Sequence, residues 1–264
     1  MDVISRLVSV VNYLAADQSY HGISEICQKM RVNKASVHRI LSSLEGMGWV
    51  VQDPETRKYK LGSPLLEIGL SLLSHLDVRM ISLPYLNQLR DSLNESAMLT
   101  LRVGFERIFV DQVQDNHEIR LLAGLGKRYP LWCGAQGKVM LANLEEREIE
   151  MVIDNLIKSG IRVLASGQNL DIDGLRKELV EIRKQGFAVS VGERVIGASA
   201  VAGPIFGPDN RVAGAISVGG PLHRFGIDRA SECGPLVSQV TEKISLQLKG
   251  FNKLLFRGEE GVPK

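Results

Sequence analysis

The chain has 264 residues, of which 44% are hydrophobic and 23% charged, with a formal net charge of +2. This length suits two domains of roughly 100–200 residues each. No run of about 18 uncharged apolar residues occurs, so the sequence predicts no membrane span. Three widely spaced cysteines, Cys27, Cys133 and Cys233, argue against a disulfide framework and favour a reducing cytoplasm.

Three short amphipathic helices are predicted at the start of the chain. Apolar residues recur at helical spacing over residues 4–15, which predicts a first helix ending near Asp17. A second apolar face covers residues 23–30. Asn33 is a good N-cap because its side chain accepts from free N–H groups, and a third helix follows over residues 34–46. Val37 belongs to the inner apolar face of this helix.

The outer face of the third helix carries small, polar and basic residues. A helix that enters the major groove needs small side chains for close approach, hydroxyls and amides for base edges, and cations for phosphates. A hairpin follows, with strands near residues 49–51 and 58–61 and a turn at residues 53–56. Three helices and this hairpin predict a winged helix-turn-helix.

Local charge supports DNA as the partner of this region. Residues 29–60 contain seven Lys or Arg and three acids, whereas residues 63–264 contain 24 of each sign. A basic excess on an outward helix and wing is typical of nucleic-acid binding. The predicted DNA contacts are Ser24, Asn33, Lys34, Ala35, Ser36, Val37, His38, Arg39, Ser42, Arg57 and Lys58.

The next segment, residues 63–77, is apolar around most of its circumference and predicts a helix that is buried on more than one side. It is either an internal packing helix or a linker helix that packs against its twin in a dimer, and we favour the linker. A third possibility for the whole chain, a pure assembly module, is disfavoured by the basic wing.

The second domain mixes strands and helices. Strands are predicted at residues 97–103, 108–113, 119–123, 188–191, 198–206 and 212–218. Helices are predicted at residues 83–89, 145–158, 171–185 and 228–249. Hairpin-connected strands with helices clustered between them indicate an α+β fold with an antiparallel sheet, rather than a doubly wound one.

Residues 134–138, Gly-Ala-Gln-Gly-Lys, resemble a phosphate-binding loop only in part. The first glycine of a P-loop would fall at Trp132, and Val139 stands where Ser or Thr is required for Mg²⁺. The small residues still open a helix whose free N–H groups attract a carboxylate. Trp132 and Cys133 either line a small pocket there or belong to the core.

A catalytic site has little support. Cys133 as a nucleophile would need a base or an orienting acid, and the sequence names no partner for it. The five histidines have no metal-ligand spacing. We therefore expect no enzyme activity, no cofactor and no metal. The rival hypothesis is an enzyme whose second domain is catalytic and whose first domain only targets DNA.

Several motifs, in this order and spacing, resemble the IclR family of bacterial transcription regulators from about Ser5 to Gly250. They are Ile23-Ser-Glu-Ile, Ala35-Ser-Val-His-Arg-Ile-Leu, Asp53-Pro-Glu-Thr, Tyr59-Lys-Leu-Gly, Gly126-Lys-Arg-Tyr-Pro-Leu, Gly137-Lys, Gly186-Phe-Ala-Val and Gly214-Ala-Ile-Ser-Val. The resemblance implies a winged helix-turn-helix, a linker helix and a GAF-like or profilin-like effector domain. It also implies dimers or dimers of dimers on operator DNA that respond to small metabolites, often carboxylic or aromatic acids.

An effector pocket is expected where the resemblance and the strand ends coincide. Its predicted residues are Leu131, Trp132, Cys133, Gly134, Ala135, Gln136, Ser190, Glu193, Ala200, Ser217 and Gly219. Four of them depart from the family pattern. Ser190 stands where an acid is frequent, Ala200 where Cys is, Gly219 where Ser is, and Trp132 where His is. These changes predict a pocket that is less polar on one side and bulkier at the loop.

Together these observations predict a cytoplasmic, ligand-responsive transcriptional regulator. The expected domains are a winged helix-turn-helix at residues 1–62, a linker helix at 63–77, an effector domain at 78–250 and a flexible tail at 251–264. The expected partners are double-stranded operator DNA, a small organic acid and further copies of the chain in a homodimer or tetramer. No membrane partner is expected.

Overall fold

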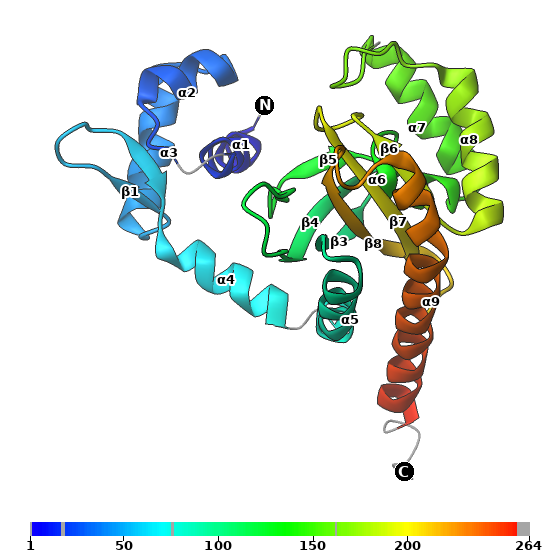
Figure 1. Cartoon of the computed structure of the whole chain (residues 1–264). Helices are drawn as coiled ribbons and strands as arrows, with labels where there is room; N and C mark the ends of the chain where they lie inside the picture. Colours follow the sequence, from blue (N-terminus) through cyan, green and yellow to red (C-terminus); the bar gives the residue numbers. More distant parts are fainter. Residues whose placement is uncertain (1, 17–18, 75–76, 162, 258–264) are drawn as a thin grey trace. The chain divides into compact units, whose positions relative to one another are not determined.

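The computed structural model describes residues 2–16, 19–74, 77–161 and 163–257. The chain divides into two compact units, Met1–His75 and Leu76–Lys264. In Figure 1 the first unit is coloured blue to cyan and the second green to red. Each unit has its own hydrophobic core.

The first unit contains the predicted three helices and hairpin. These elements are α1 (Val3–Ala15), α2 (Ile23–Met30), α3 (Lys34–Gly46), β1 (Val50–Gln52) and β2 (Tyr59–Leu61). β1 and β2 pair antiparallel. Leu14, Ile26 and Leu41 are buried together with Val50 of the hairpin, so the wing shares one core with the helices.

Local signals explain the tight turn between α2 and α3. Arg31 ends α2 in the left-handed region, with φ of 53°. Two residues later the Asn33 side chain accepts a 2.8 Å hydrogen bond from the Ser36 N–H, which begins α3. This cap satisfies one of the free N–H groups of the first turn.

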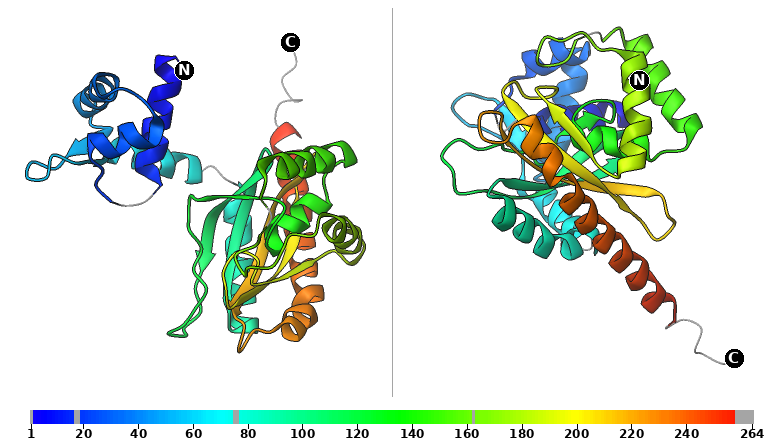
Figure 2. Two further views of the ribbon diagram at one scale, coloured as in Figure 1. Left: turned by 90° about the horizontal axis from the view of Figure 1, so that it is seen from above. Right: turned by 45° about the vertical axis from the view of Figure 1, so that its right-hand side comes forward.

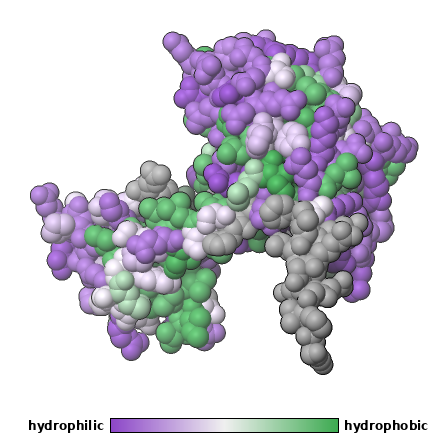
Figure 3. All heavy atoms as spheres, turned by 90° about the horizontal axis from the view of Figure 1, so that it is seen from below, coloured by the Kyte–Doolittle hydropathy of each residue, from purple (hydrophilic) through white to green (hydrophobic). Residues whose placement is uncertain are grey.

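Helix α4 (Ser63–Ser74) follows the wing and has no buried residue within its unit. Leu66, Ile68, Leu70 and Leu72 are 46–67% exposed. Figure 3 shows apolar surface of this kind in green on the first unit. The predicted linker helix was placed at residues 63–77, whereas α4 ends at Ser74 and the next helix begins at Asp77.

The second unit is built on one six-stranded antiparallel sheet with strand order β5-β4-β3-β8-β7-β6. The strands are β3 (Ser96–Val103), β4 (Glu106–Val113), β5 (Arg128–Pro130), β6 (Ala188–Val191), β7 (Ala198–Phe206) and β8 (Val212–Pro221). The sheet thus has β5 and β6 at its two edges.

Helices cover both faces of this sheet (Figures 1 and 2). α5 (Asp77–Leu93) and α9 (Ile227–Arg257) pack on the face that carries Leu99, Val201 and Ile216. α6 (Ala135–Ala142), α7 (Glu146–Ser159) and α8 (Ile172–Gln185) cover the other face, where Ala202 and Ala215 lie. All eight residues of α6 are buried between the sheet and the outer helices.

One predicted element was wrong. Residues 119–123 do not form a strand; β5 forms instead at Arg128–Pro130. The Gln112 side chain donates to the Leu121 carbonyl and accepts from the Ala123 N–H, so it replaces a strand partner there. Helix α9 extends to Arg257, so it includes the first residues of the predicted tail, and residues 258–264 lie outside the described residues.

A buried ion cluster holds this loop against the sheet. Arg224 donates to both carboxylate oxygens of Glu95, at 2.8 and 3.0 Å, and to the Ile119 carbonyl at 2.7 Å. The Glu95 side chain is 0% exposed. Asp115 lies 3.7 Å from Arg224 and accepts a hydrogen bond from Ser96. Burial alone would raise the pKa of Asp115, but the Ser96 and His117 hydrogen bonds and the Arg224 charge lower it below 3.8.

We expect Glu95→Gln to lower the free energy of unfolding by about 3 kcal/mol, because it leaves a desolvated guanidinium without its main partner. Arg211→Gln is the control, since it breaks an exposed pair with Glu145 and should change stability by about 0.5 kcal/mol or less. Urea unfolding measures both. Equal losses in the two variants would contradict a structural role for the buried cluster.

Candidate functional site

The outer face of α3 is the first candidate site. Lys34, Ala35, His38, Arg39 and Ser42 are all exposed. Their spacing of one, three or four residues places them along one face of the helix. The Ser42 hydroxyl lies 3.4 Å from Nδ1 of His38 on this face. Ser24 of α2 is also exposed.

Three of the predicted DNA contacts have other roles in this unit. Val37 is fully buried, so it cannot reach a base, and its inclusion was wrong. Ser36 is only 8% exposed because it faces the groove between α1 and α3. Asn33 is exposed, but its side-chain oxygen is used in the cap of α3. The first two positions fail because they lie on the inward side of the helix.

The wing presents its two predicted contacts at a tip that is held by hydrogen bonds. Asp53 accepts hydrogen bonds from the N–H groups of Glu55 and Thr56, and Gln52 donates to the Arg57 carbonyl. Arg57 adopts a left-handed conformation with φ of 59°. Arg57 and Lys58 are both exposed. The turn therefore fixes the backbone and leaves both cationic side chains accessible.

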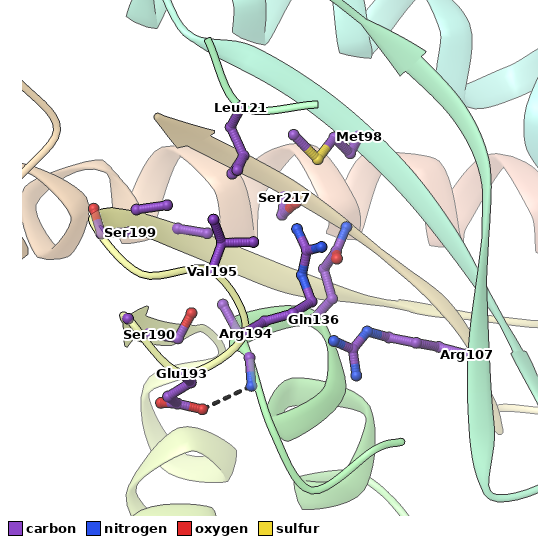
Figure 4. A pocket seen from close by; sticks show the side chains of 15 residues that line it. Met98, Arg107, Leu121, Gln136, Ser190, Glu193, Arg194, Val195, Ser199 and Ser217 are labelled. Carbon is purple, nitrogen blue, oxygen red and sulfur yellow. Dashed lines mark hydrogen bonds between the residues drawn. The ribbon is translucent and has the colours of Figure 1, made fainter. Parts of the chain in front are cut away.

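The second candidate site is a small cavity on the face of the sheet that α6 covers (Figure 4). Met98 on β3 pairs with Ser217 on β8, and Ser190 on β6 pairs with Ala200 on β7. The N-terminal end of α6 and the loop between β6 and β7 complete the wall.

Seven of the eleven predicted pocket residues line this cavity: Gly134, Ala135, Gln136, Ser190, Glu193, Ala200 and Ser217. The other four do not. Leu131 is fully buried in the core and Trp132 packs against the same core. Gly219 does not line the cavity, and a Cβ at this position would lie 3.0 Å from the side chain of Leu121, which does.

Cys133, the fourth, is 7% exposed and contacts Arg107 rather than the cavity. Burial raises the pKa of its thiol, although the Arg107 charge acts in the opposite direction. The thiol is therefore protonated at neutral pH, which does not suit a nucleophile.

Sequence reasoning missed eight lining residues: Met98, Arg107, Leu121, Gly192, Arg194, Val195, Ala198 and Ser199. The two arginines matter most for the chemistry. Arg107 is 1% exposed, and its alternation with buried Phe109 along β4 was a signal that it points inward.

The Arg107 guanidinium is desolvated. It donates to the Pro130 carbonyl, while its Nε has no hydrogen-bond partner in the described structure. Burial is the main reason that its pKa falls to about 10, and the positive charge of Arg194 adds to the fall. The group stays charged at neutral pH. Desolvated and partly unpaired, it favours an anion beside it.

Glu193 occupies the N-terminus of α6, where we expected a ligand carboxylate. One oxygen accepts from the Gly134 N–H at 2.7 Å, marked by the dashed line in Figure 4. The other pairs with Lys138 at 2.5 Å, and Lys138 also pairs with Glu178. Among the residues that line the cavity, two cations (Arg107 and Arg194) and one carboxylate (Glu193) leave one net positive charge.

Gln136 supplies a further donor. It is 5% exposed, and its Nε2 has no hydrogen-bond partner in the part of the chain that the structure describes. In Figure 4 the side chains of Gln136 and Arg194 both point into the cavity. A buried amide without a partner is costly, so this position suits a ligand acceptor.

Within the described ranges, no group of three or more His, Cys, Asp or Glu side chains could hold a metal ion. No described helix is long and apolar enough to cross a membrane.

Comparison with known proteins agrees with this arrangement. Residues 3–54 match the IclR helix-turn-helix domain, and residues 70–246 match the bacterial transcriptional regulator IclR C-terminal domain. The chain is 32% identical to the HTH-type transcriptional regulator KipR of Bacillus subtilis over 86% of this chain and 87% of KipR. It is 26% identical to the HTH-type transcriptional repressor AllR of Escherichia coli, covering 93% and 89%.

Solved structures share the fold. An IclR transcriptional regulator from Alicyclobacillus acidocaldarius superposes with a TM-score of 0.81 at 24% identity, covering 93% of this chain and 98% of the other. An IclR homologue from Microbacterium hydrocarbonoxydans, solved with 4-hydroxybenzoate, gives 0.78 at 20% identity, covering 94% and 100%. These relatives are transcription regulators rather than enzymes. With both domain models matched, the chain belongs to the IclR family of bacterial transcriptional regulators.

Proposed function

We propose that this protein is a cytoplasmic regulator that binds operator DNA as a homodimer. Its affinity for the operator falls or rises when a small carboxylic acid binds in the cavity beside α6. The observation that carries the ligand part is the pair of buried donors Arg107 Nε and Gln136 Nε2, which have no hydrogen-bond partner among the described residues and belong to residues that line one cavity. A carboxylate would satisfy both donors and match the net positive charge.

For DNA, the proposal rests on the exposed residues of α3 and on the basic tip of the wing. Lys34 and Arg39 would contact phosphate or base edges, with His38 and Ser42 beside them, and Arg57 and Lys58 would contact the backbone. In a dimer two such helices would lie about 34 Å apart on half-sites of a near-palindrome.

For the dimer, the support is α4, in which Leu66, Ile68, Leu70 and Leu72 are all exposed. Four large apolar side chains on one short helix are costly in water, and a second copy of α4 would cover them. We keep the tetramer as a further assembly of such dimers.

For the effector, the homologue solved with 4-hydroxybenzoate supports an organic acid as the ligand class. Binding would shift an equilibrium between two arrangements of the protein, and such coupling is typically about 1–3 kcal/mol. That amount changes operator occupancy several-fold.

Lys34→Ala and Arg39→Ala should each weaken operator binding and lower the slope of log K against log salt by about 0.9 for each lost phosphate contact. Mobility shifts on the upstream intergenic DNA at several salt concentrations measure both quantities. Lys177→Ala, which removes an exposed cation from α8, is the control with the same charge change. If it weakens binding equally, the effect is general electrostatics and the α3 assignment fails.

Leu66→Lys combined with Leu70→Lys should convert the dimer to a monomer, because two charges one helical turn apart would face each other across the interface. Light scattering after size exclusion measures the mass. Glu67→Lys, on the same helix, should leave the dimer intact. A dimer that survives the double substitution would rule out α4 as the contact.

Gln136→Leu should leave the unliganded protein at least as stable as the wild type, because the amide Nε2 that it removes is buried without a partner. Its affinity for carboxylates should fall about tenfold, the loss expected for one charge-assisted hydrogen bond. Calorimetric titrations with acetate and benzoate measure the affinity, and Gln88→Leu, at an exposed position of α5, is the control. Unchanged affinity for every acid would refute the carboxylate site.

A further inference from the structure

Arg194 occupies an unusual position on the loop between β6 and β7. The loop is closed by a 2.8 Å hydrogen bond from the Gly192 N–H to the Ala198 carbonyl, and Gly192 and Gly197 have φ of 67° and 74°. Its neighbour Glu193 is bonded to Gly134 and Lys138 of the α6 segment. The backbone at Arg194 is therefore anchored on one side of the cavity.

The Arg194 side chain extends to the other side. Its guanidinium carbon lies 5.2 Å from the centre of the Phe109 ring and 5.1 Å from the centre of the Tyr129 ring. Phe109 is on β4 and Tyr129 on β5, at the opposite end of the strand order from β6. The side chain thus spans the cavity from one end of the sheet toward the other (Figure 4).

Only weak contacts hold the side chain there. Within the described residues, the Arg194 guanidinium makes no ion pair or hydrogen bond, so its ring contacts are what hold it. Such cation–π contacts are worth about 0.5–2 kcal/mol each, which thermal motion or a ligand can overcome. A charged donor held this loosely over a binding cavity is free to change position.

The space left beside it is small. The cavity has a free volume of about 30 Å³. One water requires roughly 10–15 Å³ by this measure, so the cavity holds two or three waters. A carboxylate with a short substituent fits this space, whereas a benzene ring does not fit while Arg194 crosses it.

We propose that Arg194 is the gate and size filter of the effector site: in its closed position it admits a short monocarboxylate, which it binds together with Arg107 and Gln136, and it excludes aromatic acids. The inference deepens the proposed function and rests on it. A monoanion is favoured over a dianion because it neutralises the single net positive charge around the cavity. The anion also lies between two guanidinium groups that otherwise repel each other.

The test compares two acids, acetate and benzoate, by calorimetric titration of the full-length protein. Wild type should bind acetate more tightly than benzoate. Arg194→Ala removes both the charge and the obstruction, so acetate binding should weaken about tenfold while benzoate binding strengthens. The ratio of the two dissociation constants should then shift by more than about tenfold, because the two affinities change in opposite directions.

Arg194→Met separates the two effects. Methionine removes the charge but still fills the space, so acetate binding should weaken as in Arg194→Ala while benzoate remains excluded. Arg147→Ala, an exposed arginine of α7, controls for net charge and should match wild type for both acids.

The outcomes separate this inference from the function on which it rests. If both acids bind and depend on Gln136, but the ratio is the same in Arg194→Ala, the gate is refuted and the carboxylate site stands. A wild type that prefers benzoate also refutes the gate. If neither acid binds to any variant, both the proposed carboxylate effector and the gate are refuted.

Discussion

The second unit depends on one buried ammonium group. The Lys138 side chain is 4% exposed, and it is paired with Glu193 from the β6–β7 loop and Glu178 from α8. A buried charge is tolerated only when its partners are close and well oriented, so three separate segments must meet at this point. The same contact sets the position of the Gly134 N–H and therefore the wall of the cavity. The ion pairs of Lys138 therefore stabilise the fold and shape the binding site at the same time.

Much of the fold could be predicted because its signals are local. Asn33, Asp171 and the left-handed Gly186 mark helix boundaries that depend on neighbouring residues alone. The strand predicted at residues 119–123 failed because a distant side chain, Gln112, satisfies that backbone. No pattern within the segment reveals such a partner, so apolar residues there were mistaken for a strand.

The binding cavity was predicted in part for the same reason. Gly134, Gln136, Ser190 and Ser217 were found through the family resemblance and their places near helix and strand ends, and they do line one space. Arg194 could not be found this way. Its role depends on rings from β4 and β5, far away in the sequence, and an arginine on a loop is ordinarily solvated. Local charge and periodicity do not indicate that the Arg194 side chain reaches across the cavity to these rings.

The close fit between Arg107 and two glycines has an evolutionary consequence. A Cβ at Gly137 would lie 2.3 Å from the Arg107 Nη1, and one at Gly134 would lie 3.0 Å from Nη2. The guanidinium therefore fills the volume that side chains at these positions would need. A Cβ at Gly137 would also lie 2.6 Å from the backbone carbonyl oxygen of Leu131, so a smaller residue at 107 does not by itself make room for alanine at 137. Glycine at 137 should therefore be retained in homologues whatever residue stands at 107.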